Sequence, residues 1–162
     1  MGELEPFQNA VSRIDYPMAI VTAAAGDERS GCLVGFHTQC SIDPARFLVC
    51  ISRRNHTFAV AARSEHLAVH FLDRSDYPLS LLFGEQSGDT VDKFARCSWR
   101  AELGVPVLTG ARAWFVGRVL DRVSFGDHVG HLLEPVTGRV ADEELDQLAF
   151  QDVKTMQPGH PG

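Results

Sequence analysis

Two polar stretches carry the residue types that could do chemistry. The first, "SRRNHT" at residues 52–57, follows an apolar run and precedes a predicted helix. Backbone N–H groups at the start of a helix, with arginines beside them, can hold an anion such as a phosphate. A solvated loop with an ordinary helix cap is the alternative, and the residues alone leave it open. The groups that could touch the anion are Ser52, Arg53, Asn55, His56 and Thr57.

The second stretch is "SFGDHVGH", residues 124–131, which lies between two strand-like runs. Gly126 can adopt a positive φ and Asp127 tolerates a turn, so a hairpin is predicted here. His128 follows the turn directly. Taken alone it is a structural residue at a turn end, and the alternative is that the hairpin holds its ring toward a ligand.

Glycines interrupt the strand-like run "GCLVGFHTQCSI" at Gly31 and Gly35. A glycine inside a strand indicates the close approach of a ligand or of another backbone. At Gly35 a β-bulge is an equal alternative. The segment from Gly31 through Cys32, Leu33 and Val34 to Gly35 is therefore a second candidate binding surface.

Other chemistries are disfavoured by the motifs the chain lacks. It has no dinucleotide-binding glycine motif, no P-loop and no nucleophile elbow. The pairs His66/His70 and His128/His131 have no carboxylate or thiolate that completes a known metal-binding spacing. No metal site is predicted, and Trp99 and Trp114 are interpreted as core or interface residues.

Composition indicates one ordinary globular domain. The chain has 162 residues, of which 44% are hydrophobic and 22% charged, with a formal net charge of −6. An acidic protein repels the phosphate backbone, so nucleic acid is not an expected partner. The four cysteines form no C-x-x-C pair and are predicted to be buried free thiols. Without a signal-peptide pattern or a membrane-length apolar run, a cytoplasmic protein is expected.

The apolar pattern favours strands over helices. Residues 1–15 are predicted to form a short amphipathic helix, 26–31 a turn, and 57–64 and 73–88 helices, with Asn55 or Thr57 capping the first and Ser75 or Asp76 opening the second. Residues 89–99 are irregular or briefly helical. Strands are expected at 16–25, 32–42, 46–52 and 66–72, and between residues 107 and 136.

The C-terminal residues leave two possibilities. Residues 142–153 fit a helix by their leucine spacing, but 148–153 fit a last strand equally well, and 157–162 are expected to be a loose end. The remaining strands come as antiparallel hairpins with helices inserted after the third and the fourth. The predicted fold is therefore mainly β, a closed or nearly closed antiparallel barrel with helical insertions.

Taken in order, these pieces resemble the flavin reductase-like family, whose fold is an antiparallel, FMN-binding split β-barrel. The similarity covers residues 12–137. It rests on "YPMAIVTAAAGDERSGCLVGFHTQCSIDP", "FLVCISRRNHTFAVAARSEHLAVHFL", "LLFGEQSGDTVDKFA", "GVPVLTGARAWFVGRV" and "GDHVGHLLEPV". The domain is accordingly expected at residues 1–141, followed by a partly flexible C-terminal extension at 142–162.

The resemblance implies a role for each matched position. Residues Gly31 to Gly35 would line the isoalloxazine ring, and the 52–57 stretch would hold the ribityl chain and phosphate. Phe83, Lys93 and Phe94 would close the site, and His128 would face the nicotinamide of NAD(P)H. It also implies a homodimer with the flavin near its interface, where Trp114 would find a partner, and a companion monooxygenase that uses reduced flavin.

The chain departs from the family at Leu33, Gly35, Phe36 and Gln39, where many members carry Thr or Ser. Backbone N–H groups would then hold more of the polar flavin edge, or the ring would sit differently. The function implied is an NAD(P)H-dependent flavin reductase that uses FMN or FAD. An electron carrier or redox sensor without turnover, and a split barrel that binds haem or another ligand, remain alternatives.

Overall fold

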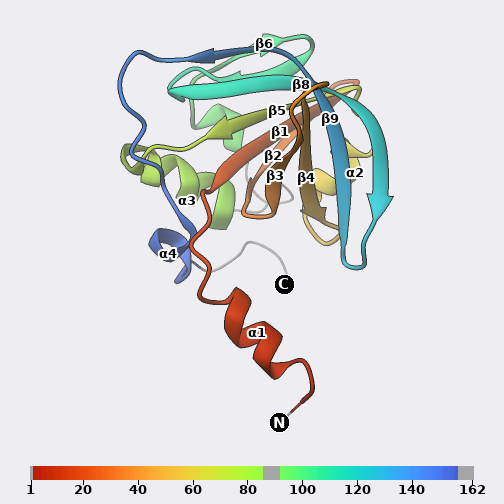
Figure 1. Ribbon diagram of the computed structural model, residues 1–162. Helices are drawn as coiled ribbons and strands as arrows, with labels where there is room; N and C mark the ends of the chain where they lie inside the picture. Colours follow the sequence, from red (N-terminus) through yellow and green to blue (C-terminus); the bar gives the residue numbers. More distant parts are fainter. Residues whose placement is uncertain (1, 86–91, 157–162) are drawn as a thin grey trace.

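The computed structural model describes residues 2–85 and 92–156, and most of them form antiparallel strands (Figure 1). Seven strands make one sheet in the order β2-β1-β5-β8-β9-β4-β3, and β6 pairs with β7 alone. The predicted mainly-β antiparallel fold is confirmed. The strands are β1 (Ala19–Ala25), β2 (Glu28–Val34), β3 (His37–Ser41), β4 (Arg46–Ser52), β5 (His66–Phe71), β6 (Trp99–Glu102), β7 (Val105–Leu108), β8 (Ala113–Ser124) and β9 (His128–Val140).

The sheet curls because its two edge strands are consecutive in the chain. β2 and β3 lie at opposite edges, yet only Gly35 and Phe36 connect them. The Cα atoms of Val34 and His37 are three residue steps apart and lie no more than about 11 Å from each other, so the sheet must bend until its edges approach one another. The same link corrects the prediction of one strand over residues 32–42. It also ends β2 at the mouth of the pocket described below.

The first hairpin turn is tighter than predicted. The turn was expected to occupy residues 26–31, but β2 already begins at Glu28 and pairs with Ala25. Gly26 has a φ of 59°, so the sharp reversal needs only Gly26 and Asp27. Gly31 is consequently a strand residue opposite Thr22.

Short helices fill the connections. They are α1 (Glu5–Val11), α2 (His56–Ala61), a 3₁₀ turn (Arg74–Asp76) continuous with α3 (Tyr77–Glu85), a second 3₁₀ turn (Lys93–Ala95) and α4 (Phe150–Val153). Asn55 caps α2, as one of the two predicted candidates. Asp73, rather than Ser75 or Asp76, caps the turn before α3. Residues 86–91, which carry the end of that predicted helix and the start of the next stretch, lie outside the described residues.

The helix predicted over residues 142–153 is largely wrong, since only Phe150–Val153 are helical. The preceding residues run extended between two parts of the fold. Leu148 accepts a hydrogen bond from the Met18 N–H (2.8 Å) and donates one to the Leu72 carbonyl (2.8 Å). Its side chain is 1% exposed. Main-chain pairing with residues 17–18 and 72–73 therefore overrides the helical leucine spacing. The boundary at residue 141 stays a prediction, and residues 157–162 are not described.

The core has an interior cluster and a second cluster under α3 and α4. The first joins β1, β2, β4, β5 and α2 around Val21, Val49 and Leu67. The second joins Met18, Ile20, Leu72, Phe83, Phe94, Leu108, Leu148 and Val153. Trp114 belongs to a third group and is 7% exposed, so it is a core residue rather than spare surface.

The cysteines are all free thiols, as predicted, but they are not all buried. Cys32 is buried, Cys50 and Cys97 are partly buried, and Cys40 is exposed. β3 is an edge strand, and Cys40 lies at the register shift between Gln39 and Ser41, where its side chain is exposed to solvent.

Candidate functional site

The two polar stretches of the sequence lie side by side. β4 and β9 pair so that Ser52, the last residue of β4, is opposite His128, the first residue of β9. Arg53 then ties residues 52–57, the elbow between β4 and α2, to the β8–β9 hairpin. Its N–H donates to the Asp127 carbonyl (2.9 Å) and its guanidinium Nε donates to the Gly126 carbonyl (3.0 Å). The hairpin therefore holds His128 beside the elbow.

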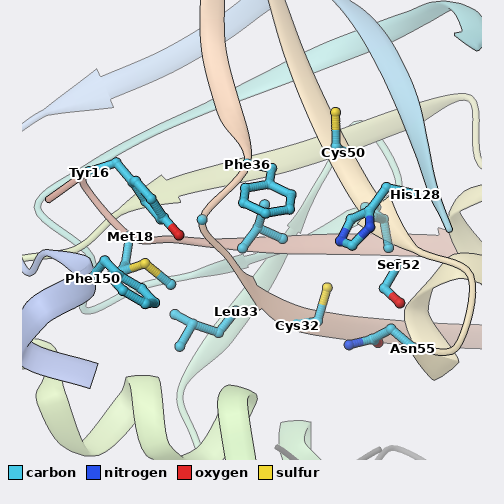
Figure 2. A pocket seen from close by; sticks show the side chains of 13 residues that line it. Tyr16, Met18, Cys32, Leu33, Phe36, Cys50, Ser52, Asn55, His128 and Phe150 are labelled. Atoms are coloured by element: carbon cyan, nitrogen blue, oxygen red, sulfur yellow. The ribbon is translucent and has the colours of Figure 1, made fainter. Parts of the chain in front are cut away.

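A pocket opens where this corner meets the end of β2 (Figure 2). Its volume is about 240 Å³. Ser52, Asn55 and His128 form a polar end, and Tyr16, Met18, Leu33 and Phe150 lie at the opposite, apolar end. The lining residues are Tyr16, Met18, Cys32, Leu33, Val34, Gly35, Phe36, Cys50, Ile51, Ser52, Asn55, His128 and Phe150.

The elbow is fixed by a helix cap and by a buried hydroxyl pair. The Asn55 Oδ1 accepts from the Thr57 N–H (2.9 Å), which leaves the amide nitrogen of Asn55 for the pocket. Thr57 is fully buried and its hydroxyl pairs with that of Ser30 (2.8 Å). Thr57 thus holds α2 against β2, and Asn55 and Ser52 present their polar atoms to the pocket.

Aromatic rings line the apolar end and continue to the hairpin. Tyr16 stacks on Phe150, with ring centroids 5.0 Å apart, and lies 6.2 Å from Phe36. Phe36 in turn lies 5.0 Å from the ring of His128. The Phe150 N–H donates to the Tyr16 carbonyl (2.9 Å), so main-chain bonding also holds this pair in place. Four rings from distant parts of the chain form one wall of the pocket.

The two glycines that stood out in the sequence make room for side chains. A Cβ at Gly31 would lie 2.7 Å from the Phe83 Cε1 atom, and a Cβ at Gly35 would lie 2.6 Å from the Tyr16 Cε2 atom. Such separations are far below van der Waals contact. Gly31 therefore admits Phe83, and Gly35 lets the ring of Tyr16 lie against the chain between β2 and β3.

Lys93 joins β2 to α3 from beneath the pocket. Its buried ammonium donates to the carbonyls of Gly31 (3.0 Å) and Phe83 (3.1 Å). Burial lowers the pKa of Lys93 from its usual value. Phe94 packs edge-on against Phe83, with centroids 5.6 Å apart. These contacts set the position of the β2 segment that lines the pocket.

The hairpin carries the charge nearest to His128. Its Nδ1 donates to the carboxylate of Asp127 (2.8 Å). The hydrogen bond to His128 and the electrostatic attraction to its ring lower the pKa of Asp127 from its ordinary value. The carboxylate orients the imidazole, so the ring keeps one face toward Phe36 and the pocket.

Cys32 at the pocket floor is an unreactive thiol. It is fully buried, and burial raises its pKa to about 11, with Lys93 acting in the opposite direction. The thiol form therefore dominates at neutral pH. Cys32 contributes shape and polarisability to the pocket rather than a nucleophile.

Half of the predicted site residues come together at this pocket. Cys32, Leu33, Val34, Gly35, Ser52, Asn55 and His128 line it, and Phe83 lines an adjoining cavity that shares Met18, Leu33, Asn55 and Phe150 with it. The remaining predicted residues line neither of these two cavities, and their contact with a ligand stays a prediction. They are Gly31, Arg53, His56, Thr57, Lys93 and Phe94.

Sequence reasoning did not assign Tyr16, Met18, Phe36, Cys50, Ile51 and Phe150 to the site. Phe36 carried a signal in the sequence, since it is one of the positions at which the chain departs from the family it resembles. Tyr16 and Phe150 are brought together by main-chain pairing between the two ends of the chain, which no local pattern reveals.

His70, another histidine candidate, has structural surroundings. Both ring nitrogens of His70 are hydrogen-bonded, Nδ1 to the Ile20 carbonyl (2.9 Å) and Nε2 to the Leu108 N–H (3.0 Å). Among residues 2–85 and 92–156, no group of three His, Cys, Asp or Glu side chains could hold a metal ion. Within the same residues no helix has the length and apolar character needed to cross a membrane.

Comparison with known proteins identifies the family. The model of the flavin reductase like domain matches residues 11–158. The stachydrine N-demethylase reductase subunit of Rhizobium meliloti (strain 1021) is 31% identical over 119 residues, which are 70% of this chain and 50% of that protein. The FMN reductase (NADH) RutF of Methylorubrum extorquens is 28% identical over 147 residues, 90% of this chain and 71% of the relative.

A solved structure confirms the split-barrel fold. The flavin reductase domain protein from Arthrobacter sp. FB24 superposes with a TM-score of 0.81 at 22% identity, covering 97% of this chain and 94% of that one. The chain spans half or less of the length of several curated relatives that it matches. From the domain match over residues 11–158 and the shared fold, the chain belongs to the flavin reductase-like domain family.

Proposed function

We propose that this protein is an NAD(P)H-dependent flavin reductase that binds FMN or FAD in the pocket between β2, β4 and the β8–β9 hairpin. The observation that carries the proposal is the pocket's division into an aromatic end and a polar end. A flavin has the same division, because an apolar-faced ring system continues into a polar ribityl phosphate. A bound flavin accepts hydride from reduced nicotinamide and passes electrons onward.

The polar end fits the ribityl and phosphate groups. Ser52 offers a hydroxyl and Asn55 an amide nitrogen, and the exposed side chains of Arg53 and Arg54 supply positive charge nearby. The Arg53 guanidinium also donates to the Gly126 carbonyl, so its charge is fixed near the elbow. A phosphate placed here would be held by charge-assisted hydrogen bonds.

The middle of the pocket fits a flat ring. Cys32 to Val34 of β2, the following Gly35, and Cys50 to Ser52 of β4 form its sides, and their side chains are small or apolar. A flat ring bound against this surface would displace water, which would strengthen the few polar contacts made there. His128, oriented by Asp127, is the residue we assign to positioning the nicotinamide rather than to acid–base chemistry.

Names of relatives support the same reaction. One matched protein is named an FMN reductase (NADH), and another is a reductase subunit of a demethylase. We accordingly propose that reduced flavin from this protein serves a monooxygenase partner. We also place it in the cytoplasm, where nicotinamide is available and the four free thiols stay reduced.

A homodimer is part of the proposal. α1 lies apart from the strands in Figure 1, and none of its residues is buried. Leu4, Phe7 and Val11 are all exposed, and their i, i+3, i+7 spacing places them on one side of the helix. A helix of seven residues is marginal without packing. A second copy of the chain would provide that packing, and sedimentation equilibrium should give twice the chain mass.

The test is an absorbance spectrum of the purified protein with FMN, followed by addition of NADH under air. A reductase consumes NADH continuously when free FMN or FAD is present. A yellow protein with a single, stoichiometric reduction would instead be an electron carrier. A haem band in the spectrum, or no interaction with either flavin, would refute the proposal.

A further inference from the structure

The apolar end of the pocket contains one hydroxyl that has no partner. Of the thirteen lining residues only Tyr16 and Ser52 carry a hydroxyl, and Ser52 lies at the polar end. Around Tyr16 the lining consists of Met18, Leu33, Phe36 and Phe150, with Gly35 beneath the ring. Tyr16 is thus the only strong hydrogen-bonding side chain at that end.

The Tyr16 hydroxyl is aimed into the pocket. Figure 2 shows its ring entering from the edge of the cavity with the oxygen directed inward. Within the described part of the chain, this oxygen forms no hydrogen bond. Tyr16 is only partly buried, so its hydroxyl is open to the pocket and a ligand bound there can be its partner.

Several contacts hold the Tyr16 ring in its position. Phe150 stacks on one side at 5.0 Å, and Phe36 lies 6.2 Å away. Gly35 lets the Tyr16 ring lie close to the backbone, because a Cβ atom at residue 35 would be only 2.6 Å from the Tyr16 Cε2 atom. The Tyr16 carbonyl is bonded by the Phe150 N–H at 2.9 Å. Both the backbone and the ring of Tyr16 are therefore constrained.

Partial burial also keeps the phenol protonated. It raises the pKa of Tyr16 above the usual value of 10.0, so the group is a donor throughout the neutral range. A neutral donor suits the carbonyl oxygens and ring nitrogens of a flavin.

Resting on the proposed function, we infer that Tyr16 is a flavin-binding residue whose hydroxyl donates a hydrogen bond to the polar edge of the isoalloxazine ring. Negative charge develops on that edge when the ring accepts hydride. A donor there is accordingly expected to stabilise the reduced flavin more than the oxidised one.

The test compares Tyr16→Phe with Tyr77→Phe, since these are the two tyrosines of the chain. Each substitution removes one hydroxyl and keeps the ring. Tyr77 begins α3, is 38% exposed and does not line the pocket. FMN is titrated into the wild type and both variants, with flavin fluorescence and the visible absorption spectrum as readouts. Urea unfolding without FMN checks that the Tyr16→Phe protein remains folded.

The expected result is FMN binding about three- to tenfold weaker for Tyr16→Phe, with a shifted visible band, and no change for Tyr77→Phe. Equal dissociation constants and identical bound spectra for Tyr16→Phe and the wild type would overturn the inference alone. A wild type that binds neither FMN nor FAD would instead defeat the proposed function, and the role of Tyr16 with it.

Discussion

The two ends of the pocket are built in different ways. The polar end comes from residues 52–57 and from the 124–128 turn, each a continuous stretch with its own local structure. The apolar end joins Tyr16, Phe36 and Phe150, and the first and last of these lie 134 positions apart in the chain. Local hydrogen bonds shape each stretch of the polar end and Arg53 joins the two stretches, whereas tertiary packing alone assembles the apolar end.

This difference has consequences for stability. The apolar end rests on the cluster that contains Met18, Ile20, Leu72 and Leu148, so it depends on the whole fold. The polar end depends mainly on the Asn55 cap and on the link from Arg53 to the hairpin. Damage to the core should reach the apolar end first, and damage to a cap should remain at the polar end.

Acid gives the largest expected effect. Burial lowers the pKa of His70 to about 4, against 6.5 when unfolded, so the unfolded chain binds the extra proton first. The contribution of His70 to the free energy of unfolding should fall by a few kcal/mol as pH drops from about 6.5 to about 4, and burial of His37 and His131, which lowers their pKa values too, acts in the same direction. His70 bonds Ile20 and Leu108 of the cluster under the apolar end.

Urea unfolding across this pH range measures the effect. His66→Gln is the control, because it alters a histidine of the same strand that is only partly buried. Its unfolding free energy should show the same pH dependence as the wild type. Stability that is equal at about pH 7 and about pH 4.5 would show that His70 is not held neutral in the folded protein.

Substitution of Gly35 should disturb the apolar end of the pocket without creating a cavity in the core. Gly35→Ser places a Cβ where the Tyr16 ring now lies, so the ring must move. We expect FMN affinity to fall about tenfold, because the added side chain overpacks the space that the Tyr16 ring now occupies. Gly110→Ser is the matched control, because a Cβ there meets nothing within 4 Å. Unchanged FMN affinity in Gly35→Ser would mean that the position of Tyr16 does not matter to the flavin.

The sequence predicts the polar end of the pocket better than the apolar end. A loop before a helix and a Gly-Asp turn, which are local patterns, made Ser52, Asn55 and His128 candidates, and the family resemblance supplied the role predicted for each. Tyr16 and Phe150 were missed because Leu148 pairs with Met18 and Leu72 across the fold. The β-rich fold was readable from strand-like runs. The break at Gly35 and the extended path of residues 142–149 were not, since tertiary pairing overrides both local patterns.

Substitution of Asn55 tests the polar end of the pocket and should have a smaller effect. Asn55→Ala removes the cap of the Thr57 N–H and should cost about 1 kcal/mol of unfolding free energy. Asn55→Asp keeps an oxygen for the cap, so stability should be retained, but it replaces the amide donor with a negative charge. Urea unfolding and FMN titration separate the two roles. Equal FMN affinity in Asn55→Asp and the wild type would remove Asn55 from the phosphate end.

His128 should give the smallest effect on flavin binding. His128→Ala removes the ring that we assign to the nicotinamide and leaves Ser52 and Asn55 in place. The KM for NAD(P)H should rise several-fold while the dissociation constant of FMN stays nearly unchanged. Steady-state NADH oxidation and FMN titration supply the two constants. If neither constant moved, His128 would be a structural turn residue only.

A crystal structure of the protein with FMN bound tests the two-ended site most directly. Our account predicts the isoalloxazine between the β2 segment and the aromatic wall, with a polar ring atom within hydrogen-bond distance of the Tyr16 hydroxyl and the phosphate beside Ser52 and Asn55. A flavin bound with its phosphate at the aromatic end, or outside this pocket altogether, would contradict it.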